Sequence, residues 1–296
     1  MELLQLHYFR KVAKLEHMTK AAQELHIPQS ALSKTISRLE EDLGVPLFDR
    51  KGRYIRLNTF GKAYLKKVEI ALTALEEGQR EVKDLAGMEK GELLIATTTH
   101  KCFSGIIGSF LTSYPNIKVK MNRASEQEKV RQLRNGDIDF CITFPPIQQD
   151  GIKGISFLTE EILLAVPSTH RFAHRSKVDL SELSDDPFIL IEKGNPFREM
   201  TDRFCEQAGF TPNVACEVDE HSAIGHFIPS GVGVAFLPET LVDKRKTSYH
   251  FVHIHRPVCR RIYQLAWMED RYISTASLKF REFFVQHFTS QQRNRI

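Results

Sequence analysis

Residues 18–37 read MTKAAQELHIPQSALSKTIS and hold two short helical patterns joined by a turn. The apolar residues of the second pattern recur at steps of four, three and four, along one stripe of a helix: Leu32, Ile36, Leu39 and Leu43. Short hydroxyls and long cations occupy the other side: Ser30, Ser33, Lys34, Ser37 and Arg38. Such a face suits a DNA major groove, where cations reach guanine edges or phosphates. Taken alone, the pattern fits a solvated helix face equally well.

The segments on either side favour DNA. Upstream, Thr19 can cap a short helix whose Ala21 and Ala22 are small enough for a second helix to cross closely. Downstream, LFDRKGRYIRL predicts two short strands around a turn, with four cations on seven consecutive positions: Arg50, Lys51, Arg53 and Arg56. A helix-turn-helix followed by a basic hairpin is expected to lie along a phosphate backbone.

One pattern extends over about sixty residues: Leu6, Phe9, Val12, Thr19, Ala21, Ala22, Leu25, Gln29, Ser30, Ala31, Leu32, Ser33, Ile36, Leu39, Glu40, Leu43, Gly44, Leu47, Phe48, Arg50, Arg53, Leu57 and Gly61. It resembles the winged helix-turn-helix domain of LysR-type transcriptional regulators. The resemblance implies base or phosphate contacts from Gln29, Ser30, Ser33 and Lys34, and backbone contacts from Arg50 and Arg53. Arg38 and Lys51 complete the candidate DNA-binding set. Pro28 departs from the family, which usually has Ser or Thr as the helix cap, and Ser30 stands where Pro is common.

The charge distribution agrees with a nucleic-acid partner. The chain has 296 residues and a net charge of +4, and its 42% hydrophobic and 26% charged residues are ordinary for a globular protein. Residues 1–65 hold 11 Lys and Arg against 7 Asp and Glu, whereas the remainder holds 30 of each. The positive excess is therefore confined to the N-terminal part.

No signal-peptide pattern is present, and no apolar run approaches the ~18–20 residues of a membrane span. We therefore expect a cytoplasmic protein with no membrane partner. The five cysteines (Cys102, Cys141, Cys205, Cys216 and Cys259) lack a CxxC spacing, so neither a disulfide framework nor a structural zinc site is expected.

A long helix is predicted from Asn58 or Thr59 to about Leu85. Seven residues recur at steps of three and four: Leu65, Val68, Leu72, Leu75, Gln79, Val82 and Ala86. This heptad pattern predicts a seam that pairs with a second copy, giving a homodimer or a dimer of dimers. Packing against the protein's own body is the alternative.

From Gly91 onward, strand and helix patterns alternate, and a second unit with the same alternation begins near Ile155. This predicts an α/β domain with parallel strands and helices on both faces. The segments RNGDIDF, AVPSTH, DDPFILIEKG, EQAGFTPN and SGVGVAFLPE resemble the two-lobed effector-binding domain of LysR-type regulators, itself similar to periplasmic solute-binding proteins. The expected organisation is a winged helix-turn-helix domain (1–58, with the motif at 18–37), a linker helix (59–88) and an effector-binding domain (89–296). Its first lobe spans about 91–155 and 268–296, and its second about 156–267.

Ligands of such folds lie at the carboxyl ends of the strands, which places Thr98, Thr99, His100 and Lys101 at a helix N-terminus suited to an anion. The resemblance adds Ser125, Phe144, Asn195, Phe197 and Ser222 to the effector-binding set, although a loop or capping role is an equal alternative for each. The expected ligand is a small effector of unknown identity, with an anion favoured by Lys101. No cofactor is expected.

Other chemistries have weaker support. His253 and His255 share one strand face, but His250 falls on the other, so no metal site is expected. Cys205 and Cys216 form a conceivable peroxide-sensing pair, with unpaired buried thiols the commoner case. The sequence lacks GxSxG, GxxxxGK[ST], HExxH and the Rossmann glycine fingerprint, which argues against an enzyme. We therefore predict a bacterial, effector-controlled transcriptional regulator that binds double-stranded DNA, with RNA polymerase as a further candidate partner.

Overall fold

The computed structural model describes residues 1–296 except 52–53, 87–90, 99–102, 220, 242–247 and 294–296. The chain divides into two compact units. The first comprises Met1–Gly91 with Arg134–Asp137 and Arg271–Thr275, and the second comprises Glu92–Leu133, Ile138–Asp270 and Ala276–Ile296. Within the described residues, no helix is both long enough and apolar enough to cross a membrane.

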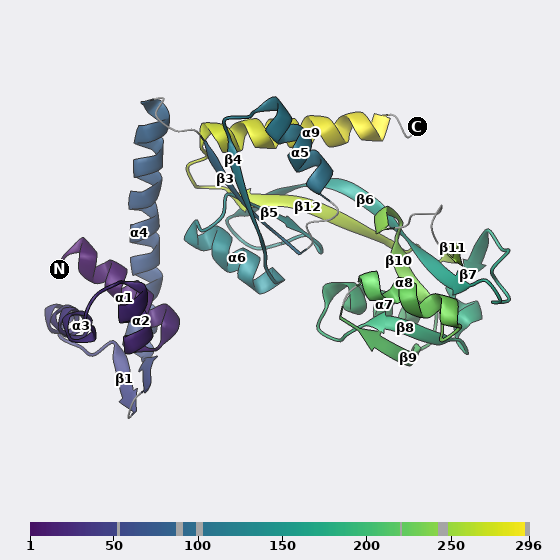
Figure 1. The fold of residues 1–296 in the computed structure, drawn as a ribbon, viewed down its shortest axis with the longest axis horizontal. Coiled ribbons are helices and arrows are strands. Elements are labelled where there is room, and N and C mark those ends of the chain that lie inside the picture. Colours follow the sequence, from purple (N-terminus) through teal and green to yellow (C-terminus); the bar gives the residue numbers. More distant parts are fainter. Residues whose placement is uncertain (52–53, 87–90, 99–102, 220, 242–247, 294–296) are drawn as a thin grey trace. The chain divides into compact units, whose positions relative to one another are not determined.

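The first unit contains a winged helix-turn-helix followed by a long helix (Figure 1). Its elements are α1 (Leu3–Leu15), α2 (Met18–Glu24), α3 (Gln29–Leu43), β1 (Phe48–Lys51), β2 (Tyr54–Leu57) and α4 (Thr59–Leu85). The predicted apolar stripe of α3 is confirmed, since Leu32, Ile36 and Leu39 are fully buried against Phe9 and Val12 of α1. The strands β1 and β2 pair antiparallel and form the predicted hairpin.

The ends of the helices differ in one detail from the prediction. His17, and not Thr19, caps α2, because its Nδ1 accepts a hydrogen bond from the Lys20 amide at 3.3 Å. Thr19 lies inside the helix. At the start of α4, a Cβ at Gly61 would lie 2.1 Å from the Leu47 carbonyl oxygen, so glycine allows the close approach of this helix to the chain before the hairpin.

The predicted seam of α4 is wrong in its first half. Val68 and Leu72 are buried, and Leu65 is packed against the same core of the first unit, which includes Phe9. These residues are therefore not available to a second copy. A different side of α4, here called the apolar face, is exposed in the single chain: Phe60, Ala63, Ile70, Ala71, Ala74, Leu75, Val82 and Leu85. Only Leu75 and Val82 belong to both sets.

The second unit has two lobes that share a large mixed sheet. The strand order is β4-β3-β5-β12 (Arg260–Met268)-β6 (Ile152–Pro167)-β11 (Tyr249–Arg256)-β7 (Lys177–Asp179), with β10 (Ala235–Pro238) paired to β6. The strands of the first lobe are β3 (Glu92–Thr97), β4 (Lys118–Arg123) and β5 (Phe140–Thr143), and they are parallel as predicted. The helices α5 (Ser104–Ser113) and α9 (Thr275–Arg293) cover one face and α6 (Glu126–Asn135) covers the other (Figure 1).

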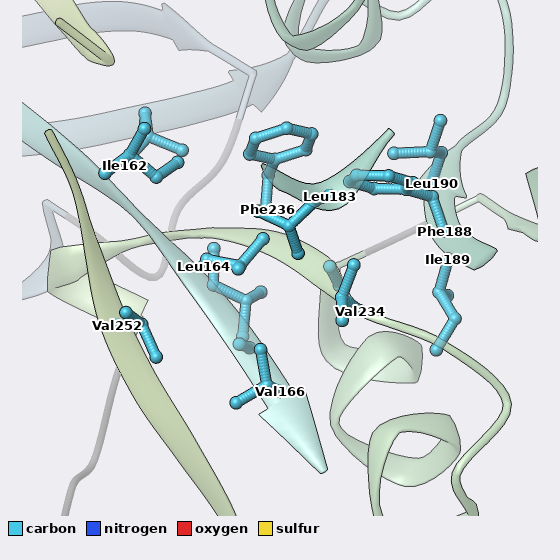
Figure 2. Packing of buried hydrophobic residues seen from close by; sticks show 14 of the residues in the cluster. Ile162, Leu164, Val166, Leu183, Phe188, Ile189, Leu190, Val234, Phe236 and Val252 are labelled. Atoms are coloured by element: carbon cyan, nitrogen blue, oxygen red, sulfur yellow. The ribbon is translucent and has the colours of Figure 1, made fainter. Parts of the chain in front are cut away.

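The second lobe is built on the C-terminal part of β6, where β10 and β11 pair with it. Its strands are β7 (Lys177–Asp179), β8 (Pro187–Ile191), β9 (Asn213–Val218), β10 (Ala235–Pro238) and β11 (Tyr249–Arg256). Its helices are α7 (Pro196–Gln207), α8 (His221–Phe227) and three short 3-10 helices at Leu180–Leu183, Ile228–Ser230 and Glu239–Leu241. Figure 2 shows its core, where Leu164 and Val166 of β6 lie near Phe188 and Phe236. These two rings stack with centroids 5.6 Å apart.

Two long antiparallel strands connect the lobes: β6 (Ile152–Pro167) and β12 (Arg260–Met268). Strand β12 was not predicted from the sequence. The two strands pair from Ile152 opposite Met268 to Glu161 opposite Arg260, and the register skips Phe157. Phe157 is therefore a bulge residue within an otherwise regular ladder.

Candidate functional site

The first candidate site is the exposed face of α3. The side chains of Gln29, Ser30, Lys34 and Arg38 are exposed and that of Ser33 is half-buried. The apolar stripe on the other side anchors the helix, so these five polar side chains are presented on a rigid element. Arg50 and Lys51 lie in β1, and Arg53 lies outside the described residues.

Two carboxylates fix the hairpin relative to the helices. Glu40 of α3 accepts a hydrogen bond from the Leu47 amide at 2.7 Å, just before β1. Glu16, after α1, accepts from the Leu57 amide at 3.1 Å, at the end of β2. Both ends of the hairpin are therefore tied to the helical core. This arrangement holds the hairpin at a set position beside α3.

The start of α3 has no side-chain cap. Pro28 occupies the N-cap position, and its carbonyl accepts from the amides of Ala31 and Leu32. Within the described residues, no acceptor is paired with the amides of Gln29 and Ser30. Free amides at a helix N-terminus are donors suited to a phosphate. The departure from the usual cap therefore leaves two donors next to the exposed face.

The second candidate site centres on Arg261 of β12, which is 5% exposed. Its guanidinium carbon lies 4.7 Å from the ring centre of Tyr263, 5.6 Å from that of Phe197 and 5.8 Å from that of Phe144. These rings come from β12, from α7 of the second lobe and from the residue that follows β5 in the first lobe. Arg261 therefore joins aromatic side chains of both lobes.

Glu160 neutralises the charge of Arg261. Arg261 Nε donates to Glu160 Oε2, and both side chains are almost fully buried. The other carboxylate oxygen, Oε1, accepts from the Thr240 amide at 2.8 Å and also from the Thr240 hydroxyl. Within the described part of the chain, no acceptor is paired with the two terminal amino groups of Arg261. The pair thus has no net charge but keeps free donors.

Lys129 of α6 is a second buried cation. Its side chain is fully buried, and Nζ donates to the Thr143 hydroxyl at 2.8 Å. That hydroxyl lies 3.3 Å from the Pro145 carbonyl, to which it donates. Burial lowers the pKa of Lys129, and the nearby Cys141 and Glu126 oppose this. Thr143 ends β5, so Lys129 Nζ lies at the carboxyl end of a parallel strand.

The structure brings two of the predicted effector-binding residues together, since Phe144 and Phe197 both pack on Arg261. Ser125 accepts from the Glu128 amide at 3.3 Å, and Asn195 accepts from the Phe197 amide at 2.9 Å. Both thus have the capping role that the sequence left open. Thr98 follows β3 and is half-buried, and Ser222 lies in α8. Thr99, His100 and Lys101 lie outside the described residues.

Sequence reasoning missed the two buried cations. Lys129 precedes the buried Leu133 by one helical turn, a spacing that places it on the inward face of α6. That signal was present in the sequence. Arg261 and Glu160 are 101 residues apart, and only the pairing of β6 with β12 brings them together.

The histidines of β11 do not form a metal site in the described part of the chain. His253 Nδ1 lies 3.0 Å from Glu161 Oε1, and His255 Nδ1 lies 2.9 Å from Asp179 Oδ1. Among the residues described, no group of three or more His, Cys, Asp and Glu is arranged to hold a metal ion. His250 instead contacts the His174 ring.

The thiols of Cys205 and Cys216 are free. Burial raises the pKa of Cys205 to about 12, and Asp202 adds to this. A thiol with so little thiolate reacts poorly with peroxide. These observations do not favour a redox-sensing pair.

A surface hollow of about 1060 Å³ lies between α7 and β9, and Arg198 is among its lining residues. The guanidinium of Arg198 is held by Asp202 at 2.8 Å and by Glu217 at 2.7 Å. Its charge is thus balanced within the protein, in contrast to that of Lys129.

Comparison with known proteins gives matches to both units. Residues 3–62 match the family described as "Bacterial regulatory helix-turn-helix protein, lysR family", and residues 86–289 match "LysR substrate binding domain". The chain is 33% identical over 293 residues to the HTH-type regulator YybE of Bacillus subtilis, covering 98% of this chain and 100% of that protein. It is 33% identical over 298 residues to the transcriptional dual regulator GltC of Bacillus subtilis, covering 99% of each.

Among solved structures, full-length CbnR in complex with its target DNA has a TM-score of 0.68 at 23% identity, covering 97% of this chain and 99% of that chain. At this identity the likeness concerns the fold. The predicted fold class, a winged helix-turn-helix and a two-lobed α/β domain, is confirmed.

Proposed function

The chain belongs to the LysR family of DNA-binding transcriptional regulators with an effector-binding domain. We propose a separate role in this function for each part of the chain. The exposed face of α3 reads the operator, the apolar face of α4 pairs two copies, and the second unit binds the effector. The proposed domain limits are 1–58, 59–88 and 89–296. The exposed polar face of α3, held on a buried apolar stripe, carries this proposal.

In DNA binding, the contacts divide into two kinds. Gln29, Ser30 and Ser33 lie on the first turns of α3 and are assigned to base edges in the major groove. Lys34 and Arg38, together with Arg50, Lys51 and Arg53 of the hairpin region, are assigned to phosphates. The free amides at the start of α3 are further phosphate donors. The exposure of the α3 side chains and the two hydrogen bonds that hold the hairpin support DNA contacts from both elements.

LysR regulators act as oligomers, and we assign the pairing surface to the apolar face of α4. Five of its side chains are 50–82% exposed: Phe60, Ile70, Leu75, Val82 and Leu85. An exposed apolar stripe along a helix is unfavourable in water and favours burial against a partner. The small residues Ala71 and Ala74 permit two helices to approach closely. A dimer places two copies of α3 on an interrupted palindrome.

LysR regulators bind small-molecule effectors, and we place the effector of this chain between the two lobes, next to Arg261. Aromatic rings from both lobes pack on this guanidinium, so a ligand there contacts both lobes. Binding is proposed to change the angle between the lobes and thereby the arrangement of the dimers and the bend of the DNA. The family consists of regulators, and this chain is proposed to act by binding and not by catalysis.

The proposed setting is the cytoplasm, where operator DNA and RNA polymerase are present in a bacterium. We propose that the protein contacts RNA polymerase when its operator lies next to the promoter. A footprint that overlaps or abuts the promoter is the observation that would support it.

The test is mobility-shift binding to the DNA upstream of the protein's own gene and of any divergent neighbour. A salt-sensitive shift is expected, with a footprint over two half-sites about one or two helical turns apart. No shift in dilute buffer, or equal affinity for random DNA, would contradict the role as a sequence-specific regulator. An effector that altered transcription without altering the footprint or the bend would contradict the proposed mechanism.

A further inference from the structure

The hydrogen bonds of Lys129 do not balance its charge. An ammonium group has three N–H donors, and the Thr143 hydroxyl takes one of them. Among the described residues, no carboxylate forms an ion pair with Nζ, and Glu126 acts on it only at longer range. A fully buried ammonium with one neutral partner is costly, because burial removes the solvation of the charge.

The buried ion pair on β6 and β12 does not offset this charge. Arg261 and Glu160 form a neutral pair, in which Thr240 completes the hydrogen bonds of the carboxylate. Burial raises the pKa of the Cys141 thiol to about 12, so this neighbour of Lys129 is uncharged at neutral pH. When Lys129 is protonated, Lys129, Arg261, Glu160 and Cys141 together carry one uncompensated positive charge.

The unbalanced charge lies where an α/β fold binds its ligands. Thr143 is the last residue of β5, and the next residue, Phe144, packs on Arg261. Thr97, at the end of the neighbouring parallel strand β3, is also fully buried. Ligands of open α/β sheets bind outside the carboxyl ends of such strands. Lys129 Nζ therefore contacts the last residue of β5, and the Arg261 guanidinium packs on the residue that follows.

We propose that Lys129 binds the negatively charged group of the effector, and that the effector is a small monoanion, with a carboxylate as the expected group. This inference rests on the proposed effector-binding role of the second unit. The two free donors of Lys129 bind the anion, and the single uncompensated charge sets the charge of the ligand. Because Nζ is fully buried in the free protein, the anion can reach it only through a movement that uncovers it.

A purely structural lysine would behave differently. If Lys129 served only to hold Thr143, its replacement would weaken the fold and would leave the response to anions unchanged. If Lys129 binds a ligand, it lowers the stability of the free protein, because its charge is unpaired until the anion binds. An apolar residue of similar length should then leave the free protein as stable or more stable.

The experiment compares the full-length wild type with Lys129→Met and Lys129→Gln, with Lys118→Met as the control at an exposed lysine of β4. Thermal midpoints are measured without added ligand and with sodium acetate, pyruvate or benzoate. Acetamide, benzamide and sodium chloride serve as neutral and ionic-strength controls. Without ligand, we expect Lys129→Met to unfold at the wild-type temperature or about 2–4 °C higher. A midpoint several degrees lower would overturn the proposal.

At least one carboxylate is expected to raise the midpoint of the wild type and of Lys118→Met, and its amide is not. Both Lys129 variants should lose this rise. The rise persisting in either Lys129 variant, or an equal rise with the amide, would overturn the proposal. If no carboxylate raises the midpoint of the wild type, the midpoints of wild type and Lys129→Met without ligand test the proposal by the criterion given above.

The same preparations are tested for operator binding. If the wild type fails to bind DNA, the regulatory role itself is wrong. If all variants bind DNA and the Lys129 variants still respond to carboxylate, only the present inference is wrong.

Discussion

Arg261 of β12 and Glu160 of β6 are direct cross-strand partners, and their side chains form a buried ion pair. The pair lies on the two strands that connect the lobes, and the Arg261 guanidinium also packs on rings from each lobe. One ion pair therefore joins the connecting strands to the proposed effector site. Its removal should affect stability and ligand response together.

Replacing Glu160 with Gln should lower the free energy of unfolding by about 3 kcal/mol, because it leaves a buried guanidinium without a counter-charge. Denaturant unfolding of the full chain measures this. Glu269→Gln is the matched control, since it breaks the exposed pair of Glu269 with Lys153 at the other end of the same strands and should cost less than about 1 kcal/mol. Equal effects of the two changes would contradict the importance of the buried pair.

A charge on the apolar face of α4 should separate the protomers. Ala74→Glu places a carboxylate in the middle of that face and should raise the dissociation constant of the dimer by at least tenfold, measured by sedimentation. Lys62→Glu changes the charge of an exposed residue on another side of the same helix and should leave the assembly unchanged. Dissociation by both variants would show a general effect of charge, and by neither would show that another surface pairs the copies.

Substitutions on the exposed face of α3 should change the affinities for operator DNA and for random DNA to different extents. Gln29→Ala is expected to weaken operator binding by about 1–3 kcal/mol and to leave random DNA nearly unaffected, because it removes a base contact. Arg38→Ala should weaken both and reduce the slope of log affinity against log salt by about one, because it removes a phosphate contact. Titrations by fluorescence anisotropy at several salt concentrations measure both quantities. An equal loss on the two DNAs for Gln29→Ala would refute its role in reading bases.

The missing cap of α3 is testable through stability. Pro28→Ser and Pro28→Ala both remove the ring that restricts the unfolded chain, so their difference reports the cap alone. The Ser variant should be more stable than the Ala variant by about 1 kcal/mol, because its hydroxyl can accept from a free amide of the first turn. Chemical unfolding provides the comparison. We also expect Pro28→Ser to bind DNA more weakly than Pro28→Ala, because the hydroxyl then occupies a phosphate donor.

Thiol labelling should distinguish the cysteines by burial and pH. Burial raises the pKa of Cys141, Cys205 and Cys259 to about 12, so at pH 8 only about one thiol in ten thousand is ionised. Of the four cysteines that the structure describes, Cys216 is partly exposed and should react first with iodoacetamide, as read by peptide mapping. The thiolate fraction of the three buried cysteines rises about tenfold per pH unit. Rapid labelling of Cys205 at pH 8 would restore the case for a redox pair.

The helices with a strong apolar stripe could be predicted from the sequence. The predicted stripe of α3 agrees with the structure, because the spacing of apolar residues shows which face of a helix is buried. The face of α4 that packs on its own unit could not be distinguished from a pairing face. Both faces are apolar, and only the positions of α1 and the hairpin decide which one is buried.

The candidate effector site was only partly predictable. Phe144 and Phe197 were expected there, but Arg261 and Glu160 were not, because their partnership depends on strands that meet far apart in the sequence. Lys129 lies in the charged segment EQEKVRQLRN, which reads as a solvated helix unless its distance from Leu133 is considered. Strand β12 was missed because its pairing with β6 is a tertiary feature.

The bulge at Phe157 interrupts the hydrogen-bond ladder of the two strands that connect the lobes. A bulge bends its strand and increases the local twist, so the relative orientation of the lobes depends on the backbone at this residue. The Phe157 ring packs against the rings of Phe284 and Phe288 of α9, with ring centroids 4.6 and 4.5 Å away. The bulge residue is thus packed on a helix that is more than a hundred residues away in sequence. Any change in the bend of β6 at Phe157 therefore requires these three rings to repack.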